Sequence, residues 1–132
     1  DRRARQNLNE VDFLTTEELE RGLVYSVGWH PESEDELRQM FPPKNQRQII
    51  RKILSIAASI PQSLELNTVR QLHGAHLPPQ ADGAYELRIG SGHRIAFWMF
   101  AEQERLLVYL AGTHDYANER FLSASQSRGD LE

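Results

Sequence analysis

The amino-acid sequence predicts one small α+β domain, in which an N-terminal strand and a C-terminal β-meander form an antiparallel sheet with two helices packed on one face. Two observations predict this class. An apolar stripe at helical spacing runs along residues 44–59, and strand-like segments joined by short loops follow at about 84–90, 93–101 and 105–113. A chain of 132 residues has the usual length of one domain.

The chain opens with a polar extension and a first strand. Residues 1–23 are mixed in charge, and Thr15-x-x-Glu18 is a capping box that predicts a short helix over 16–23. We expect this segment to be an extension outside the domain proper. Residues 24–29 read Val-Tyr-Ser-Val-Gly-Trp, rich in β-branched and aromatic side chains, which indicates a strand that Pro31 closes.

Two helices are expected next. Ser33-x-x-Glu36 is a second capping box, and it predicts a helix of about two turns that Pro42-Pro43 ends. The longer helix covers about 44–59. Its apolar stripe includes Ile49, Ile53 and Ile56, which should face the sheet.

The rest of the chain contains an irregular stretch, the meander and a tail. Residues 61–83 are rich in Pro and Gly, with one turn of helix expected before Gly74. The last two strands of the meander are apolar on both faces and should be central. A short terminal helix should end the domain near residue 122, and 123–132 should be a flexible tail whose final Leu-Glu pair resembles a cloning scar.

Strand register brings two arginines together. If Gly90–Gly92 is a three-residue loop, Ile89 pairs with His93 and Arg88 with Arg94, so one face of the sheet stays apolar. A two-residue loop would mix charge into both faces. Two guanidinium groups directly opposed destabilise a bare sheet, and a bound anion would remove that cost.

The second hairpin adds a histidine. A three-residue loop over 102–104 places Arg94 opposite Gly112, and His114 then shares the face of Arg94 and Arg88. Two exposed cations and an imidazole suit metal-independent phosphodiester cleavage by the 2′-hydroxyl, because arginines stabilise the developing charge and histidine transfers a proton. The alternatives are solvated ladder arginines, ion pairs with Glu86 or Glu102, and a turn histidine paired with Asp115.

Charge and motifs limit the function classes. The net charge of −4 argues against nucleic-acid binding over the whole surface. From residue 37 to 64, however, every charged side chain is basic, and Arg47, Arg51 and Lys52 are candidate RNA or ribosome contacts, unless they form a solvated helix face. No nucleotide fingerprint and no cysteine is present, and His73-x-x-His76 alone is no metal site, so we expect neither cofactor nor metal.

Nothing in the sequence indicates a membrane protein. No apolar run approaches the roughly 18 residues of a membrane helix, and no signal-peptide core follows the first residues. We expect a cytoplasmic protein without a membrane partner.

Three stretches carry a family resemblance. Leu72-His-Gly, then Tyr85-Glu-Leu-Arg-Ile-Gly-Ser-Gly-His-Arg-Ile-Ala-Phe, then Leu107-Val-Tyr-Leu-Ala-Gly-Thr-His-Asp-Tyr resemble the RelE/ParE/HigB superfamily of bacterial toxins. The resemblance spans about 24–122. It implies a RelE-like fold and a type II toxin neutralised by an antitoxin protein. Ribonuclease members of the superfamily cut mRNA in the ribosomal A site without metal.

The resemblance also implies site residues. Arg94 matches the arginine of the middle strand, Arg88 a basic position of the preceding strand, and His114 the basic or histidine position after the last strand. Tyr116 or Arg120 matches the late position where many members have tyrosine. Glu86 departs from the pattern, because ribonuclease members often have lysine there.

The candidate catalytic residues are therefore Arg88, Arg94, His114 and Tyr116, and Arg120 joins the candidate RNA contacts. We expect the Arg94 and His114 side chains to be exposed. The hypothesis is a metal-independent, ribosome-dependent mRNA endoribonuclease. The alternatives are a ParE-like DNA gyrase inhibitor that cleaves nothing, and an inactive member of the fold that only binds a partner.

Overall fold

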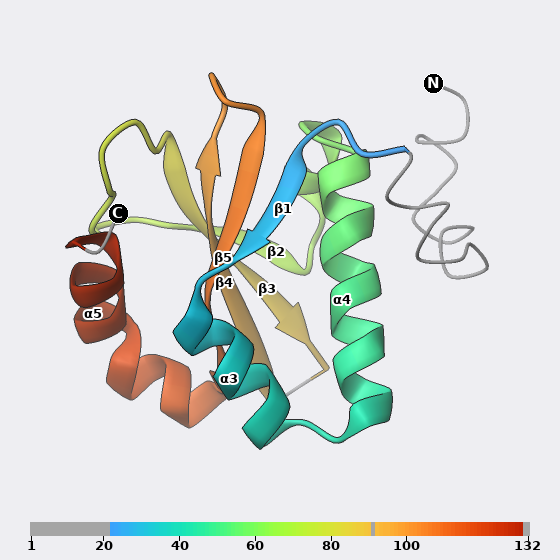
Figure 1. Cartoon of the computed structure of the whole chain (residues 1–132), viewed down its shortest axis with the longest axis vertical. Coiled ribbons are helices and arrows are strands. Elements are labelled where there is room, and N and C mark those ends of the chain that lie inside the picture. Colours follow the sequence, from blue (N-terminus) through green and yellow to red (C-terminus); the bar gives the residue numbers. More distant parts are fainter. Residues whose placement is uncertain (1–21, 91, 131–132) are drawn as a thin grey trace.

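The computed structural model describes residues 22–90 and 92–130, which form a five-stranded sheet flanked by helices (Figure 1). The elements in chain order are β1 (Ser26–Trp29), α3 (Pro31–Met40), α4 (Pro43–Ala58), the 3₁₀ helix η2 (Gln62–Glu65), β2 (Val69–Leu72), β3 (Gly83–Ile89), β4 (His93–Phe100), β5 (Arg105–Thr113) and α5 (His114–Asp130). The expected helix over 16–23 lies almost wholly outside the described residues.

The sheet confirms the α+β class and the β-meander, with one correction. Its strand order is β1-β5-β4-β3-β2. The pairs β2–β3, β3–β4 and β4–β5 are antiparallel, whereas β1 runs parallel to β5, with Ser26 opposite Arg105 and Trp29 opposite Val108. An all-antiparallel sheet was expected. A long connection through helices and three strands joins β1 to β5, so no tight turn forces these two strands to be antiparallel.

A second correction concerns β2. The sequence predicted a turn of helix before Gly74, but residues 69–72 form a strand that pairs with β3, with Val69 opposite Leu87 and Arg70 opposite Glu86. The strand lies at the edge of the sheet. A four-residue edge strand has no room for a clear alternation of apolar and polar residues, so its pairing with β3 decides its structure.

Helix α3 starts earlier than the capping box predicted. His30 is its N-cap residue, with Nδ1 accepting a hydrogen bond from the Glu32 N–H at 3.2 Å, and Pro31 occupies the first turn. Proline is favoured there because its missing N–H is not needed. Ser33 therefore lies inside the helix, where its hydroxyl donates to the carbonyl oxygens of His30 (2.7 Å) and Val108 (2.9 Å).

One face of the sheet forms the main core with α3 and α4. The stripe of α4 lies where the sequence predicted, because Ile49, Ile53 and Ile56 are all buried. They join a cluster that also contains apolar side chains of α3 and of the sheet: Leu37, Phe41, Val69, Leu87, Ile95, Phe97, Met99, Leu106 and Val108. Burying the three isoleucines contributes roughly 5–8 kcal/mol.

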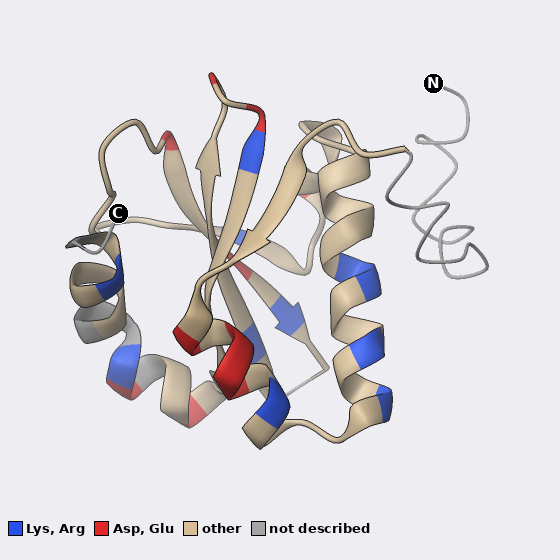
Figure 2. Cartoon of the chain, in the orientation of Figure 1, with Lys and Arg blue, Asp and Glu red and all other residues tan. Residues whose placement is uncertain are grey.

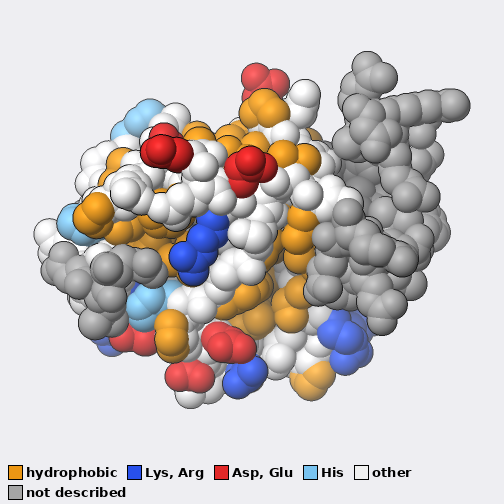
Figure 3. Space-filling model, turned by 45° about the horizontal axis from the view of Figure 1, so that its top comes forward, with side chains coloured by type: hydrophobic (Ala, Val, Ile, Leu, Met, Phe, Trp, Pro, Cys, Tyr) orange, Lys and Arg blue, Asp and Glu red, His pale blue; other side chains and the backbone are white. Residues whose placement is uncertain are grey.

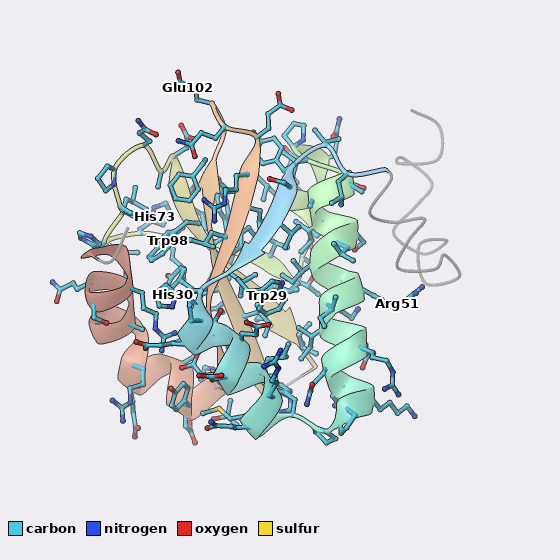
Figure 4. The ribbon with its side chains drawn as sticks, viewed as in Figure 1. Trp29, His30, Arg51, His73, Trp98 and Glu102 are labelled. Atoms are coloured by element: carbon cyan, nitrogen blue, oxygen red, sulfur yellow. The ribbon has the colours of Figure 1, made fainter. Side chains whose placement is uncertain are left out.

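The opposite face is covered in part by α5. This helix runs to Asp130, through residues that the sequence analysis assigned to a flexible tail, and it packs Ala117 and Ala124 against the sheet. Trp98 lies on this side (Figure 4) and stacks on Tyr109 with ring centroids 3.9 Å apart. Helices therefore cover both faces, in contrast to the expected packing on one face, and α4 and α5 lie on either side of the sheet in Figure 1.

The β4–β5 hairpin has the predicted register at one end only. Phe100 pairs with Arg105, so the loop has four residues, 101–104, where three were expected. A β-bulge at Tyr109 then shifts the register by one residue, and Arg94 lies opposite Gly112 as predicted. The longer loop and the bulge compensate for each other, because the loop takes one extra residue, Ala101, from the β4 side and the bulge adds one residue on the β5 side.

In the part of the chain that the structure describes, none of the helices is both long and apolar enough to cross a membrane.

Candidate functional site

The predicted arginine pair is present in the sheet. Arg88 of β3 lies directly opposite Arg94 of β4, and Ile89 opposite His93, which confirms the three-residue loop. Because Leu87 and Ile95 belong to the α4 core, both arginines belong to the other face. There an open hollow of about 380 Å³ is lined by Asn67, Thr68, Arg88, Gly90 and Arg94.

This face of the sheet is covered over only part of its length, so a hollow remains. The apolar cluster on this face lies away from the arginine pair, where α5 and the segment after β2 pack on Trp98, Leu107 and Leu110. The arginine pair lies outside this cluster, beside the residues that lead into β2. The face is therefore closed around Trp98 and open around Arg88 and Arg94.

Arg88 is exposed and held at the end of β3. Its Nη2 donates to the carbonyl oxygen of Asn67 at 2.9 Å, and its backbone N–H donates to the carbonyl of Thr68 at 2.8 Å. Both acceptors belong to the segment just before β2. This strand, which the sequence analysis missed, therefore fixes one wall of the hollow.

Arg94 is nearly buried, so its predicted exposure is wrong. Its side chain is 13% exposed, and its Nε lies 3.0 Å from Oε1 of Glu86, whose side chain is 11% exposed. The Nη1 group donates to the carbonyl of His93 at 3.2 Å. The ion pair with Glu86 is one of the alternatives that the sequence left open, and it forms because Glu86 and Arg94 are diagonal neighbours on the same face.

A third arginine joins this group through β2. Arg70 lies directly opposite Glu86, with Nη2 3.3 Å from Oε2, and its side chain is 67% exposed. Sequence reasoning missed Arg70 because β2 was not expected. We name Arg70, Glu86, Arg88 and Arg94 the open cluster. It contains three guanidinium groups and one carboxylate, which binds Arg70 and Arg94, so its net positive charge attracts anions.

His114 is the first residue of α5, and its side chain is exposed as predicted. Its backbone N–H donates to the carbonyl of Gly92 at 2.8 Å, and the neighbouring Thr113 pairs with His93. The backbone of His114 therefore lies beside the loop that precedes Arg94. The imidazole is not among the described side chains that line the hollow.

Tyr116 faces a different set of groups. Its ring lies over Gly112, where any side chain would collide with it, and its hydroxyl donates to Oε2 of Glu36. Burial and this hydrogen bond raise the pKa of Tyr116 above the usual value for tyrosine. Arg120 lies 5.9 Å from the centroid of the Tyr116 ring, within reach of a cation–π interaction.

Glu36 belongs to a second charged group, which joins α3, α5 and the edge of β5. Arg128 binds Glu32 at 2.9 Å and Glu36 at 2.8 Å, and it also donates to the carbonyl of Tyr109. Glu36 accepts a hydrogen bond from the backbone N–H of Ala111 at 3.1 Å. We name Glu32, Glu36, Tyr116 and Arg128 the closed cluster.

The closed cluster completes the sheet where β1 is too short. β1 ends opposite Val108, so the next backbone groups of β5 are bound by Glu36 and Arg128 instead. Burial by itself would lower the pKa of Arg128, but the hydrogen bonds and charges of Glu36 and Glu32 outweigh it and raise that pKa. Arg128 is therefore a cation, and its role here is structural.

The basic side chains of α4 lie elsewhere. Arg47, Arg51 and Lys52 belong to the helix that packs on the face opposite the open cluster (Figure 2). Arg51 points away from the sheet in Figure 4. The structure does not bring these residues together with Arg88 and Arg94.

Two other features of the described residues bear on where a site can lie. Figure 3 brings forward the end of the sheet with the 101–104 loop, where acidic groups, a basic side chain and hydrophobic areas lie interspersed. Among the described residues, no group of three or more His, Cys, Asp or Glu could hold a metal ion. The open cluster is therefore the best candidate site in this part of the chain.

Comparison with known proteins gives one informative result. No family model matches the sequence, and no curated protein matches it. Among solved structures, the chain is similar to a mutant of the toxin RelE from Escherichia coli in the free state, in which two arginines are replaced by alanine. The TM-score is 0.58 at 17% sequence identity, covering 80% of this chain and 98% of the other. The chain therefore has a RelE-like fold.

Proposed function

We propose that this protein is the toxin of a type II toxin–antitoxin system and acts as a metal-independent, ribosome-dependent mRNA endoribonuclease. The observation that carries the proposal is the opposed pair Arg88 and Arg94, held at the edge of a hollow on the open half of the sheet. The likeness to a protein described as a toxin supports it, since that likeness covers most of both chains.

The proposed chemistry uses the 2′-hydroxyl of the substrate. This hydroxyl attacks the neighbouring phosphorus, its proton passes to a base, and the bond from phosphorus to the 5′-oxygen breaks as that oxygen takes up a proton. The products are a 2′,3′-cyclic phosphate and a 5′-hydroxyl. Arg88 and Arg94 stabilise the negative charge that develops on the phosphate oxygens, and His114 transfers a proton near neutral pH.

The backbone position of His114 beside the loop that precedes Arg94 supports this role. Its exposed imidazole starts from a backbone that is hydrogen-bonded to Gly92, close in sequence and space to Arg94. Catalytic contacts often tighten only when the substrate is bound. Tyr116 has its hydroxyl engaged by Glu36, so the proposal gives the chemistry to Arg88, Arg94 and His114.

The partners are proposed on the same basis. The ribosome would present the mRNA to the hollow, and the exposed Arg47 and Arg120 together with Arg51 and Lys52 would contact RNA phosphates. An antitoxin protein would block the site. Contacts on the α4 side of the sheet would bind the ribosome and not the scissile phosphate, because the helix lies on the opposite face.

Toeprinting of a translated mRNA with the purified protein tests the proposal. We expect new mRNA ends inside the A-site codon, produced only on translating ribosomes. A gyrase supercoiling assay is run on the same preparation. Inhibition of supercoiling without any mRNA cleavage would favour the ParE-like alternative, and inactivity in both assays would favour a partner-binding protein.

A further inference from the structure

Glu86 and Arg94 form a close and nearly buried ion pair. Glu86 binds Nε of Arg94 at 3.0 Å, and the His93 carbonyl accepts from Nη1. Arginine presents its N–H groups in a rigid planar fork, so oxygen atoms close to two of its nitrogens restrict the orientation of the whole group. Among the described contacts, Nη2 of Arg94 is left for a ligand in the hollow that Arg94 lines.

We propose that Glu86 is the positioning residue of this site: it holds the Arg94 guanidinium so that its remaining N–H groups face the phosphate of the RNA substrate. This inference rests on the proposed function. It assigns a role to a carboxylate that simple charge arguments would place outside a phosphate site, because a negative group beside a polyanion weakens binding.

Burial supports a positioning role. The side chains of Glu86 and Arg94 are only 11% and 13% exposed, so each needs the other to offset the loss of water. An exposed carboxylate that merely adjusted the net charge would not require this geometry. The Arg70 contact with Glu86 differs, because Arg70 is 67% exposed and its contact is longer, at 3.3 Å.

Arg88 shows the same principle with another acceptor. Its Nη2 is held by the carbonyl of Asn67 at 2.9 Å. Both arginines of the pair are thus oriented by oxygen atoms before any substrate binds. Donors that are fixed in advance stabilise a transition state better than donors that must reorient.

Two substitutions separate position from charge. Glu86→Asp keeps the charge and withdraws the carboxylate by one methylene, whereas Glu86→Gln removes the charge and keeps an oxygen acceptor at the same reach. We expect Glu86→Asp to lower the single-turnover cleavage rate about 10- to 100-fold when the ribosome–mRNA complex is saturating. The concentration of complex that gives half the maximal rate should change little. Glu86→Gln should stay within about threefold of wild type. Glu34→Asp, a matched control in the exposed ion pair between Glu34 and Arg38 outside the open cluster, should cleave almost normally.

A charge effect predicts the opposite pattern. Glu86→Gln would then bind and cleave more strongly than wild type, and Glu86→Asp would behave like wild type. Either result, or a tenfold loss in Glu86→Gln, would overturn the positioning role. Urea unfolding of each variant shows that the compared proteins are folded.

A second readout does not depend on cleavage. In ¹⁵N NMR spectra the Nε–H signal of Arg94, assigned by its loss in Arg94→Lys, should exchange slowly with water in the wild type and Glu86→Gln, and fast in Glu86→Asp. If the wild type cleaves no mRNA, the proposed function fails. The exchange rate of the Arg94 Nε–H with water then still tests whether Glu86 holds Arg94 in place. If Glu86→Asp leaves the exchange slow, the positioning role fails even when the wild type cleaves.

Discussion

The closed and open clusters each contain an arginine that is almost buried, yet they differ in what surrounds it. The Arg128 side chain is 6% exposed and binds two carboxylates and a backbone carbonyl, which tie together α3, α5 and β5. The Arg94 side chain is 13% exposed, but it shares its one carboxylate with Arg70 and lies next to Arg88 at a hollow. A buried ion pair alone therefore does not identify a site. Surplus positive charge beside open space does.

The largest effect should come from breaking the closed cluster. Arg128→Ala leaves Glu32 and Glu36 without their cation and the Tyr109 carbonyl without its donor, and we expect it to lower the free energy of unfolding by about 3–5 kcal/mol. Urea denaturation measures this. Arg120→Ala, an exposed arginine on the same helix, is the control and should change stability by less than about 0.5 kcal/mol. Equal stability of the two variants would show that the closed cluster does not hold α5.

His114 should show the reverse behaviour. Removal of the imidazole in His114→Ala should lower the mRNA cleavage rate by roughly two to three orders of magnitude, as expected for loss of a general acid or base. Because the side chain is exposed, the urea midpoint should hardly move. Single-turnover cleavage and urea unfolding on the same sample make the comparison. Normal cleavage by His114→Ala would remove the histidine from the proposed mechanism.

Tyr116 belongs to the closed cluster through its hydroxyl, although its ring lies over Gly112, which is opposite Arg94 in the sheet. Tyr116→Phe loses the hydrogen bond to Glu36, so we expect a loss of about 1 kcal/mol in stability and nearly unchanged cleavage. Tyr116 was a candidate catalytic residue from the sequence. A hundredfold loss of cleavage with unchanged stability would return it to the site.

The smallest effect concerns alkaline pH. Burial raises the pKa of Tyr109, and burial with the Glu36 hydrogen bond raises that of Tyr116. A folded-state pKa above the unfolded value gives stability that is complete below about pH 10 and is lost as pH rises further. Urea midpoints should therefore fall above about pH 10, and less steeply in Tyr116→Phe than in the wild type. An identical slope in both proteins would contradict the shift at Tyr116.

The open cluster could be predicted in part, because the pairing of Arg88 with Arg94 follows from the local alternation of apolar and polar residues. The alternation around Gly90–Gly92 fixes which residues share a face, and this was enough to place Arg88 opposite Arg94. The apolar stripe of α4 was equally clear. Arg70 could not be found, because β2 is short, lies at the sheet edge and is defined by pairing with a strand that follows it. The Glu86–Arg94 bond was only one of several alternatives in the sequence.

The closed cluster could not be predicted, because it depends on tertiary contacts. The sequence from Ser123 to Gly129 contains serines and a glycine, which are weak helix formers, and it was expected to be frayed. Helix α5 persists there because Ala124 packs on the sheet and Arg128 reaches Glu32 and Glu36. One signal was available for α3: Pro31 was interpreted as the end of a strand, although proline also favours the first turn of a helix.

The most direct test of the central claim is toeprinting with Arg94→Ala beside the wild type, on protein shown by urea unfolding to be folded. We expect A-site cleavage to fall by roughly two to three orders of magnitude, because Arg94→Ala loses a group that stabilises charge in the transition state. Arg38→Ala, which removes an exposed arginine outside the open cluster, should retain cleavage. Full cleavage by folded Arg94→Ala would contradict the claim that the open cluster is the active site.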